Sequence, residues 1–112
     1  CLRAIRESGA VKGLAHITGG GLLDNLPRIL PESCDAVIDT KTWTVPAIFR
    51  AIESGGNVPR EEMYQVFNMG IGMVAIVSAD KADAILKFIC AQKHDAWLIG
   101  EVVKGSGEAK VI

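Results

Sequence analysis

Apolar and polar side chains alternate along two short stretches of the chain. In residues 11–17 and 34–39 the apolar positions recur with the period of a strand that has one buried face. In the second stretch, Asp35 and Asp39 fall on the side opposite to Cys34. We therefore expect two strands and place both aspartates on a solvated strand face.

The second half of the chain predicts three further strands. Residues 73–77 read Met-Val-Ala-Ile-Val and contain no polar position. Such a run is typical of a strand covered on both faces, so we expect it in the centre of a sheet. Residues 97–103 predict the next strand, the glycines of residues 105–107 predict a turn, and residues 109–112 predict an edge strand.

Helical spacing of apolar side chains separates these strands. It is clearest in residues 82–90, and we expect Ser78 to cap that helix. Residues 45–52 predict another helix, with Pro46 near its start and Gly55 past its end. Further helices are expected at residues 1–7, 22–30 and 61–67.

The order of these elements points to a fold class. Helices and strands follow one another in mixed order, which indicates an α+β fold, a mixed sheet with helices packed on it, or a three-layer α/β/α arrangement. The 112 residues amount to one domain, without internal repeats or linkers. We therefore expect residues 1–112 to form a single domain.

Composition and charge exclude several classes of protein. Hydrophobic residues make up 49% of the chain, and the net charge is -1, which is typical of a soluble globular domain. No basic excess predicts nucleic-acid binding, and no apolar run of about 18 residues predicts a membrane span. The chain opens on Cys1 with a charged, helix-like run, so we interpret it as the interior of a longer chain.

The three cysteines predict neither a disulfide framework nor a zinc site. Cys1, Cys34 and Cys90 are far apart and form no C-x-x-C pair. We expect Cys34 and Cys90 to be small core residues in a cytosolic protein. We expect Trp43, Phe49 and Trp97 to be core residues as well.

The strongest candidate for chemistry is the run His16-Ile17-Thr18-Gly19-Gly20-Gly21, between a predicted strand and a predicted helix. Glycines let backbone amides turn toward an anion, and Thr18 adds a hydroxyl, so Thr18, Gly19, Gly20 and Gly21 could bind a phosphate. No G-K-[ST] follows, so this is not a Walker loop. The alternative is that the glycines serve only a tight turn and close packing.

Two side chains at or near this loop, His16 and Arg28, have two possible roles each. His16 is either a hydrogen-bonded structural residue or a donor to a phosphate or amide oxygen. Asn25 and Arg28 lie just beyond the loop and are candidate phosphate-binding residues, and Arg28 could equally be a surface arginine. His94 is far from His16 in the sequence and is expected at a solvated helix end, so no metal site is predicted.

A second glycine motif is structural. Gly70 to Ala75 match the dinucleotide pattern G-x-G-x-x-A, but a helix precedes the motif and a strand follows it. A dinucleotide loop has the reverse order, so we reject NAD binding. Gly70 and Gly72 instead allow a turn into the strand, and Asn68 is expected to hold that turn through its side chain.

Residues 15–31, AHITGGGLLDNLPRILP, closely resemble a stretch of the aminoimidazole ribonucleotide synthetases. Residues 67–73, FNMGIGM, resemble a second stretch of that family in the same order, and residues 96–100, AWLIG, resemble its late strand. Between the first two stretches, Trp43, Pro46 and Phe49 also match the family. The likeness spans nearly the whole chain, and one mild departure is Asp24, where many relatives have Glu.

The resemblance implies the C-terminal domain type of that superfamily, in a two-domain enzyme that works as a homodimer in the cytoplasm. It implies an ATP-dependent cyclo-ligase of purine biosynthesis that closes formylglycinamidine ribonucleotide to aminoimidazole ribonucleotide. ATP and Mg²⁺ would be held mostly by an N-terminal half absent from this sequence, and this chain alone is expected to be inactive. His16 would be the catalytic residue, and residues 18–21 would hold a phosphate.

Two other functions stay open. One is another ATP-dependent enzyme of the same superfamily, of the selenophosphate synthetase or thiamine-phosphate kinase type. The other is a non-catalytic regulatory domain of ferredoxin-like shape.

Overall fold

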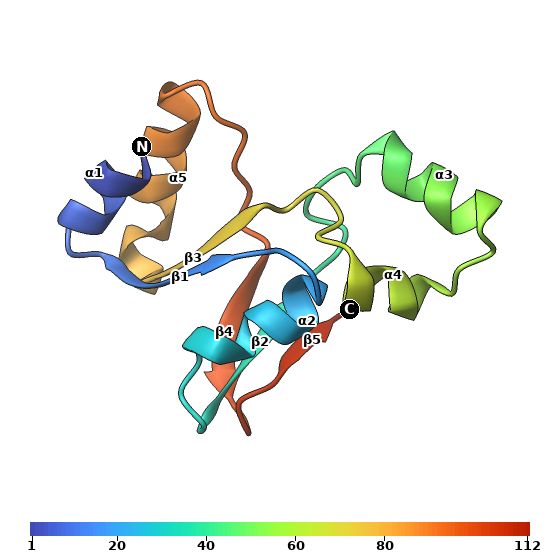
Figure 1. Cartoon of the computed structure of the whole chain (residues 1–112). Helices are drawn as coiled ribbons and strands as arrows, with labels where there is room; N and C mark the ends of the chain where they lie inside the picture. Colours follow the sequence, from blue (N-terminus) through green and yellow to red (C-terminus); the bar gives the residue numbers. More distant parts are fainter.

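The computed structural model describes residues 1–112. Five helices and five strands follow one another in mixed order (Figure 1). The helices are α1 (Leu2–Glu7), α2 (Gly21–Asn25), α3 (Ala47–Gly55), α4 (Arg60–Val66) and α5 (Ala82–Ala91). The strands are β1 (Val11–His16), β2 (Cys34–Ile38), β3 (Met73–Val77), β4 (Gly100–Lys104) and β5 (Ala109–Val111), and single 3-10 turns cover Pro27–Ile29 and Ala79–Lys81.

The strands form two sheets. β1 and β3 pair antiparallel, whereas β2 lies between β4, its antiparallel neighbour, and β5, its parallel neighbour. This mixture of pairings with packed helices confirms the α+β class. The short β5 is an edge strand, as its position at the end of the chain predicted.

The prediction that residues 73–77 lie centrally in a sheet is wrong. β3 pairs only with β1, and Met73 at its start is 40% exposed while Val74 is buried. An all-apolar run shows which side chains tolerate burial, but it does not show whether the chain supplies a second neighbouring strand.

Other local predictions also need correction. The strand expected from residue 97 begins at Gly100, which leaves Trp97 outside it and 42% exposed instead of in the core. Ser78 precedes the 3-10 turn and makes no capping bond through its side chain. Cys34 is only half-buried and Cys90 is exposed, because small apolar side chains also occur on surfaces.

The hydrophobic core joins the two sheets to α2 and α4. It contains Ala15, Ile17, Leu22, Leu26, Ala36, Ile38, Trp43, Met63, Tyr64, Met69, Ile71 and Val74. Trp43 was predicted to be a core residue, and it is buried with its indole Nε1 donating to the carbonyl of Met69 at 3.0 Å. Burial of the ring and pairing of its one polar atom explain why tryptophan suits this position.

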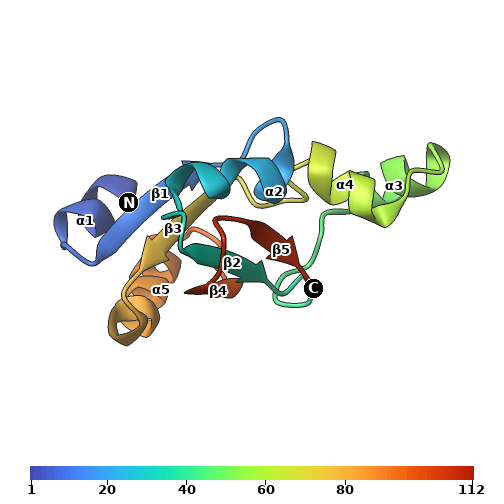
Figure 2. The same cartoon turned by 90° about the horizontal axis from the view of Figure 1, so that it is seen from below.

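The helices flank this core at opposite ends of the molecule. α1 and α5 lie beside the β1–β3 pair, and α3 and α4 lie at the other end (Figures 1 and 2). The glycine loop between β1 and α2 therefore lies near the middle of the molecule, on the side of α4. None of the helices has the length and apolar character needed to cross a bilayer.

Candidate functional site

The glycine loop follows β1 and enters α2 through two left-handed residues. Gly20 has φ 97° and Gly21 has φ 62°, a region that favours glycine. A Cβ atom on Gly21 would collide with the main-chain carbonyl oxygens of Tyr64 and Phe67 in and after α4. The close-packing alternative therefore has a physical basis at Gly21, while a Cβ on Gly19 would meet no atom within 4 Å.

The side chain of Asn25 connects three carbonyl groups of this loop. Its side-chain Nδ2 donates to the carbonyl of Gly21 at 2.8 Å and to those of Thr18 and Gly19 at 3.2 Å each. The side chain is buried, so in this structure its amide binds the loop itself. The sequence predicted Asn25 as a phosphate-binding residue, and in the structure its side-chain amide binds three carbonyls of the loop.

The amide groups of the loop are mostly unpaired within the chain. The N–H of Gly21 donates to the carbonyl of Thr18 at 3.0 Å. The N–H groups of Gly19, Gly20, Leu22 and Leu23 have no acceptor in the protein. Carbonyls held by Asn25 and amides without partners are the arrangement that a bound anion requires.

The loop borders a hollow of about 380 Å³. Half of its eight lining residues are hydrophobic, namely Ile17, Phe49, Val66 and Phe67. The other four are His16, Thr18, Gly19 and Asn68. Residues from the two motifs that resemble the family, about fifty positions apart in the sequence, thus line one site.

The second motif is held in place by its own turn. Asn68 accepts the N–H of Gly70 through Oδ1 at 2.9 Å, which confirms the expected role of its side chain. Gly70 has φ 99° and packs against the ring of Pro46. The carbonyl of Gly72 accepts the N–H of Ile17 at 2.9 Å, and His16 pairs with Met73 in the sheet. The turn therefore lies directly beside the glycine loop.

His16 is the titratable side chain of this hollow. It lies at the end of β1, is exposed, and makes no hydrogen bond or ion pair within the chain. The structure therefore contains no partner atom that would make His16 a hydrogen-bonded structural residue. Its imidazole is available to a ligand in the hollow.

Arg28 is not brought to the hollow. It lies in the 3-10 turn after α2, is exposed and makes no ion pair. This position agrees with the role of a surface arginine, which was one of the two roles that the sequence left open.

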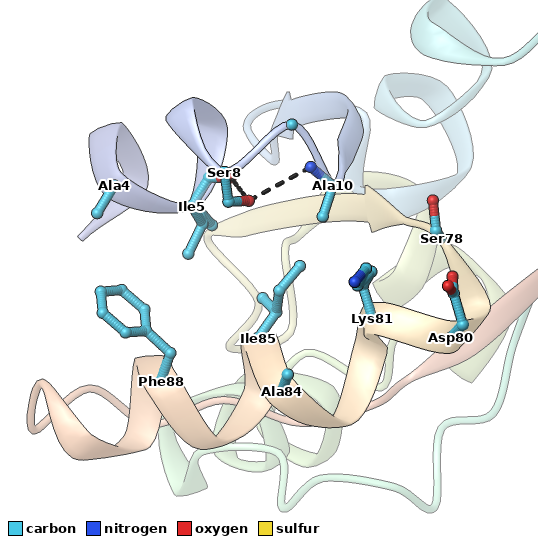
Figure 3. Close-up of a pocket in the computed structure, with 11 residues that line it drawn as sticks. Ala4, Ile5, Ser8, Ala10, Ser78, Asp80, Lys81, Ala84, Ile85 and Phe88 are labelled. Carbon is cyan, nitrogen blue, oxygen red and sulfur yellow. Dashed lines mark hydrogen bonds between the residues drawn. The ribbon is translucent and has the colours of Figure 1, made fainter.

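A second hollow, of about 460 Å³, lies between α1 and α5 (Figure 3). Ile5, Ile85 and Phe88 supply its apolar walls, and Asp80 and Lys81 lie at one end. None of the candidate catalytic or phosphate-binding residues lines it. Ser8 is already paired there, because its hydroxyl donates to Ile5 and accepts from the N–H of Ala10.

Asp35 departs most from the sequence prediction. It is only 4% exposed, although the alternating pattern placed it on a solvated face. Its Oδ1 accepts the N–H groups of Glu108 at 2.9 Å and Ser106 at 2.8 Å, and its Oδ2 lies 3.2 Å from Nζ of Lys110. These bonds, led by the one from Glu108, lower the pKa of Asp35 from 3.8 to about 2, against the opposing effect of desolvation.

The carboxylate of Asp35 therefore organises the turn between β4 and β5. A Cβ on Gly105 would collide with this carboxylate, so the glycine of the turn makes room for it. The signal in the sequence was the run Gly105-Ser106-Gly107, whose amides need an acceptor, but nothing in the strand pattern connects that run to Asp35. No group of three or more His, Cys, Asp or Glu side chains could hold a metal ion.

Comparison with known proteins supports the same family as the motifs. Residues 1–112 match the family model described as AIR synthase related protein, C-terminal domain. Over 102 residues the chain is 52% identical to a phosphoribosylformylglycinamidine cyclo-ligase of Carboxydothermus hydrogenoformans, a match that covers 91% of this chain and 29% of that protein. The chain thus spans about three tenths of the length of this curated relative.

A solved structure shares the fold. The chain superimposes on a thiamine-monophosphate kinase from Stenotrophomonas maltophilia with a TM-score of 0.66 and 18% identity, over 96% of this chain and 33% of that one. At this identity the likeness shows the architecture alone. With the family model matched from end to end, this chain belongs to the AIR synthase related proteins, as their C-terminal domain.

Proposed function

We propose that this chain is the C-terminal domain of an ATP-dependent cyclo-ligase that closes formylglycinamidine ribonucleotide to aminoimidazole ribonucleotide. The observation that carries the proposal is the hollow in which His16, Thr18 and Gly19 meet Asn68, in a chain 52% identical to a cyclo-ligase. The whole enzyme would be a cytoplasmic homodimer that acts in purine biosynthesis. Its N-terminal domain would complete the site over this hollow.

The glycine loop would hold a phosphate group of the ribonucleotide or of ATP. Four amides without acceptors and the hydroxyl of Thr18 are suited to an anion, and the neutral amides need no counter-charge. Asn25 would support this role indirectly, because its side chain keeps three loop carbonyls turned away from the anion.

The reaction needs a donor where negative charge develops. The γ-phosphoryl group passes from ATP to the formyl amide oxygen, and ADP leaves. An amidine nitrogen then attacks the formyl carbon and loses its proton to solvent, the new C–N bond closes the ring, and the C–O bond breaks to release phosphate. We assign to His16 the donation of an N–H to the transferred phosphoryl oxygen or to the reacting amide.

Mg²⁺ would reach the reaction from outside this chain. The described residues contain no cluster of three metal-ligating side chains, so the acidic ligands would belong to the N-terminal domain, together with most contacts to ATP. The part of the catalytic site in this chain would be the loop amides, Thr18 and His16.

The proposal is tested by a substrate panel on the full-length protein. ATP consumption would be measured with formylglycinamidine ribonucleotide, with thiamine monophosphate and with selenide. Turnover with the ribonucleotide alone is expected. Turnover only with thiamine monophosphate or selenide would assign the chain to another branch of the superfamily, and no turnover with any of them would favour a non-catalytic domain.

A further inference from the structure

We propose that Phe49, Val66 and Phe67, here called the aromatic wall, bind the planar ring of a phosphorylated nucleoside-type ligand whose phosphate lies at the glycine loop. The inference rests on the proposed function, and it adds the chemical class of the ligand and the residues that select it. It starts from the mixed lining of one hollow, in which polar residues of the glycine loop and aromatic residues occur together.

The composition of the hollow restricts what can fill it. Apart from His16, no ionisable side chain lines it, and half of its lining residues are hydrophobic. Inorganic phosphate or a bare sugar phosphate would satisfy the loop but leave the aromatic wall in contact with water. A ligand with an anionic end and a flat, weakly polar end would contact both kinds of lining residue, and a volume of about 380 Å³ suits a small molecule.

The two rings of the wall suit a planar partner. Phe49 and Phe67 have centroids 5.9 Å apart and planes inclined by 58°. Both side chains are only half-buried, so part of each ring remains open beyond the core. Aromatic faces bind nucleobase-type rings by stacking, with little dependence on the pattern of hydrogen-bond donors.

Phe67 of the wall is held close to the loop. Gly21 packs with its backbone against the carbonyl oxygens of Tyr64 and Phe67, and any side chain there would separate them. A second link joins α2 to α4, because Nε2 of Gln65 donates to Oδ1 of Asp24 at 2.8 Å. Phe67 and the loop amides thus form one rigid unit. A site that contacts both ends of a ligand requires such a fixed geometry.

The test measures dissociation constants in the full-length protein for three probes. They are 5-aminoimidazole ribonucleotide, ADP, and ribose 5-phosphate, which lacks a heterocyclic base. Phe49→Leu and Phe67→Leu should weaken binding of at least one ring-bearing probe by about tenfold, given the known strength of base stacking. Binding of ribose 5-phosphate should change by less than about twofold. The probe that loses affinity identifies the ring as aminoimidazole or adenine.

Three further variants separate stacking from damage to the fold. Phe49→Tyr keeps an aromatic face and should retain most of the affinity. Phe88→Leu, in the other hollow, is the matched control and should leave all three constants unchanged. If the leucine variants unfold, Val66→Ser tests the same wall at a position that is 47% exposed, with an expected loss of about threefold for the ring-bearing probe.

Two outcomes overturn the inference. Equal losses for ribose 5-phosphate and the ring-bearing probes would show that the wall does not contact a ring, as would unchanged constants in an enzyme that still turns over. In the second case the proposed function survives. If the unaltered protein binds neither ring-bearing probe and has no cyclo-ligase activity, both proposals fail together.

Discussion

His16 is placed by the sheet, and the chemistry proposed for it depends on that placement. As the last residue of β1 it lies opposite Met73, and it lines the hollow without a partner in the chain. In the full-length enzyme we expect His16→Ala to lower kcat by about 10²–10⁴-fold, the usual contribution of a positioned proton donor. His94→Ala, outside the hollow, should leave kcat unchanged. Near-normal turnover of His16→Ala would refute the assignment.

Gly21 and Gly19 form a natural pair of test positions. Gly21→Ala forces a Cβ into the carbonyls of Tyr64 and Phe67 at a positive φ, and should lower the free energy of unfolding by about 1–3 kcal/mol. Gly19→Ala meets no neighbour and should stay within about 0.5 kcal/mol of the unaltered protein. Urea denaturation measures both. A Gly21→Ala variant as stable as Gly19→Ala would contradict the packing described here.

Asp35 makes stability depend on pH in the acidic range. Its folded-state pKa of about 2 lies below the ordinary value of 3.8, so its stabilising effect is complete above pH 4. The effect is lost as pH falls toward 2, because the unfolded chain binds the proton first. Thermal unfolding between pH 5 and 2 should show a steeper loss for the unaltered chain than for Asp35→Asn. Parallel curves would show that Asp35 is not held by these bonds.

At the scale of single residues, the sequence predicted what local geometry determines. Asn68 was assigned to its turn correctly because an Asx side chain bonds within a few residues along the chain. Asp35 was misplaced because its partners Ser106 and Glu108 come from a turn 71 and 73 residues away. Asn25 was recognised as a loop neighbour, but three contacts to loop carbonyls follow only from the fold.

At the scale of elements, periodicity located most helices and strands but not their neighbours. β1, β2, α3, α4 and α5 occur close to where the apolar pattern placed them. The same pattern could not show that β3 ends up paired on one edge only, since pairing depends on strands that lie far away in the sequence. Strand β4 likewise lies at the edge of its sheet, and all of its residues are exposed.

Exposed apolar residues on and before β4 predict self-association of the isolated chain. Val102 and Val103 are 41% and 36% exposed, and Leu98 before the strand is 58% exposed. An open edge with apolar side chains pairs readily with a second copy. Sedimentation velocity should show association that increases with concentration, and Val103→Lys should reduce it without lowering the melting temperature.

The control for this prediction is Leu2→Lys, which changes an exposed apolar residue of α1 at the other end of the molecule. It should leave the association unchanged. A chain that stays monomeric at every concentration would show that the β4 edge does not mediate self-association.

At the scale of the whole molecule, the chain represents about three tenths of its curated relative, and the hollow is open. The resemblance of two motifs predicted the family, and end-to-end agreement with the family model bears this out. Which phosphate the loop would hold could not be predicted from the sequence, because under the proposed function it would depend on residues of an N-terminal domain.

Amide hydrogen exchange in the full-length protein tests the central claim most directly. Exchange would be followed in peptides covering residues 18–23, with and without saturating formylglycinamidine ribonucleotide or a non-hydrolysable ATP analogue. We expect one of the two ligands to slow exchange of the amides of Gly19, Gly20, Leu22 and Leu23, which lack acceptors within the chain. Peptides over residues 105–108, away from the hollow, should not change. Unaltered exchange in the loop with both ligands, in a preparation that turns over substrate, would contradict the assignment of the glycine loop as a phosphate site.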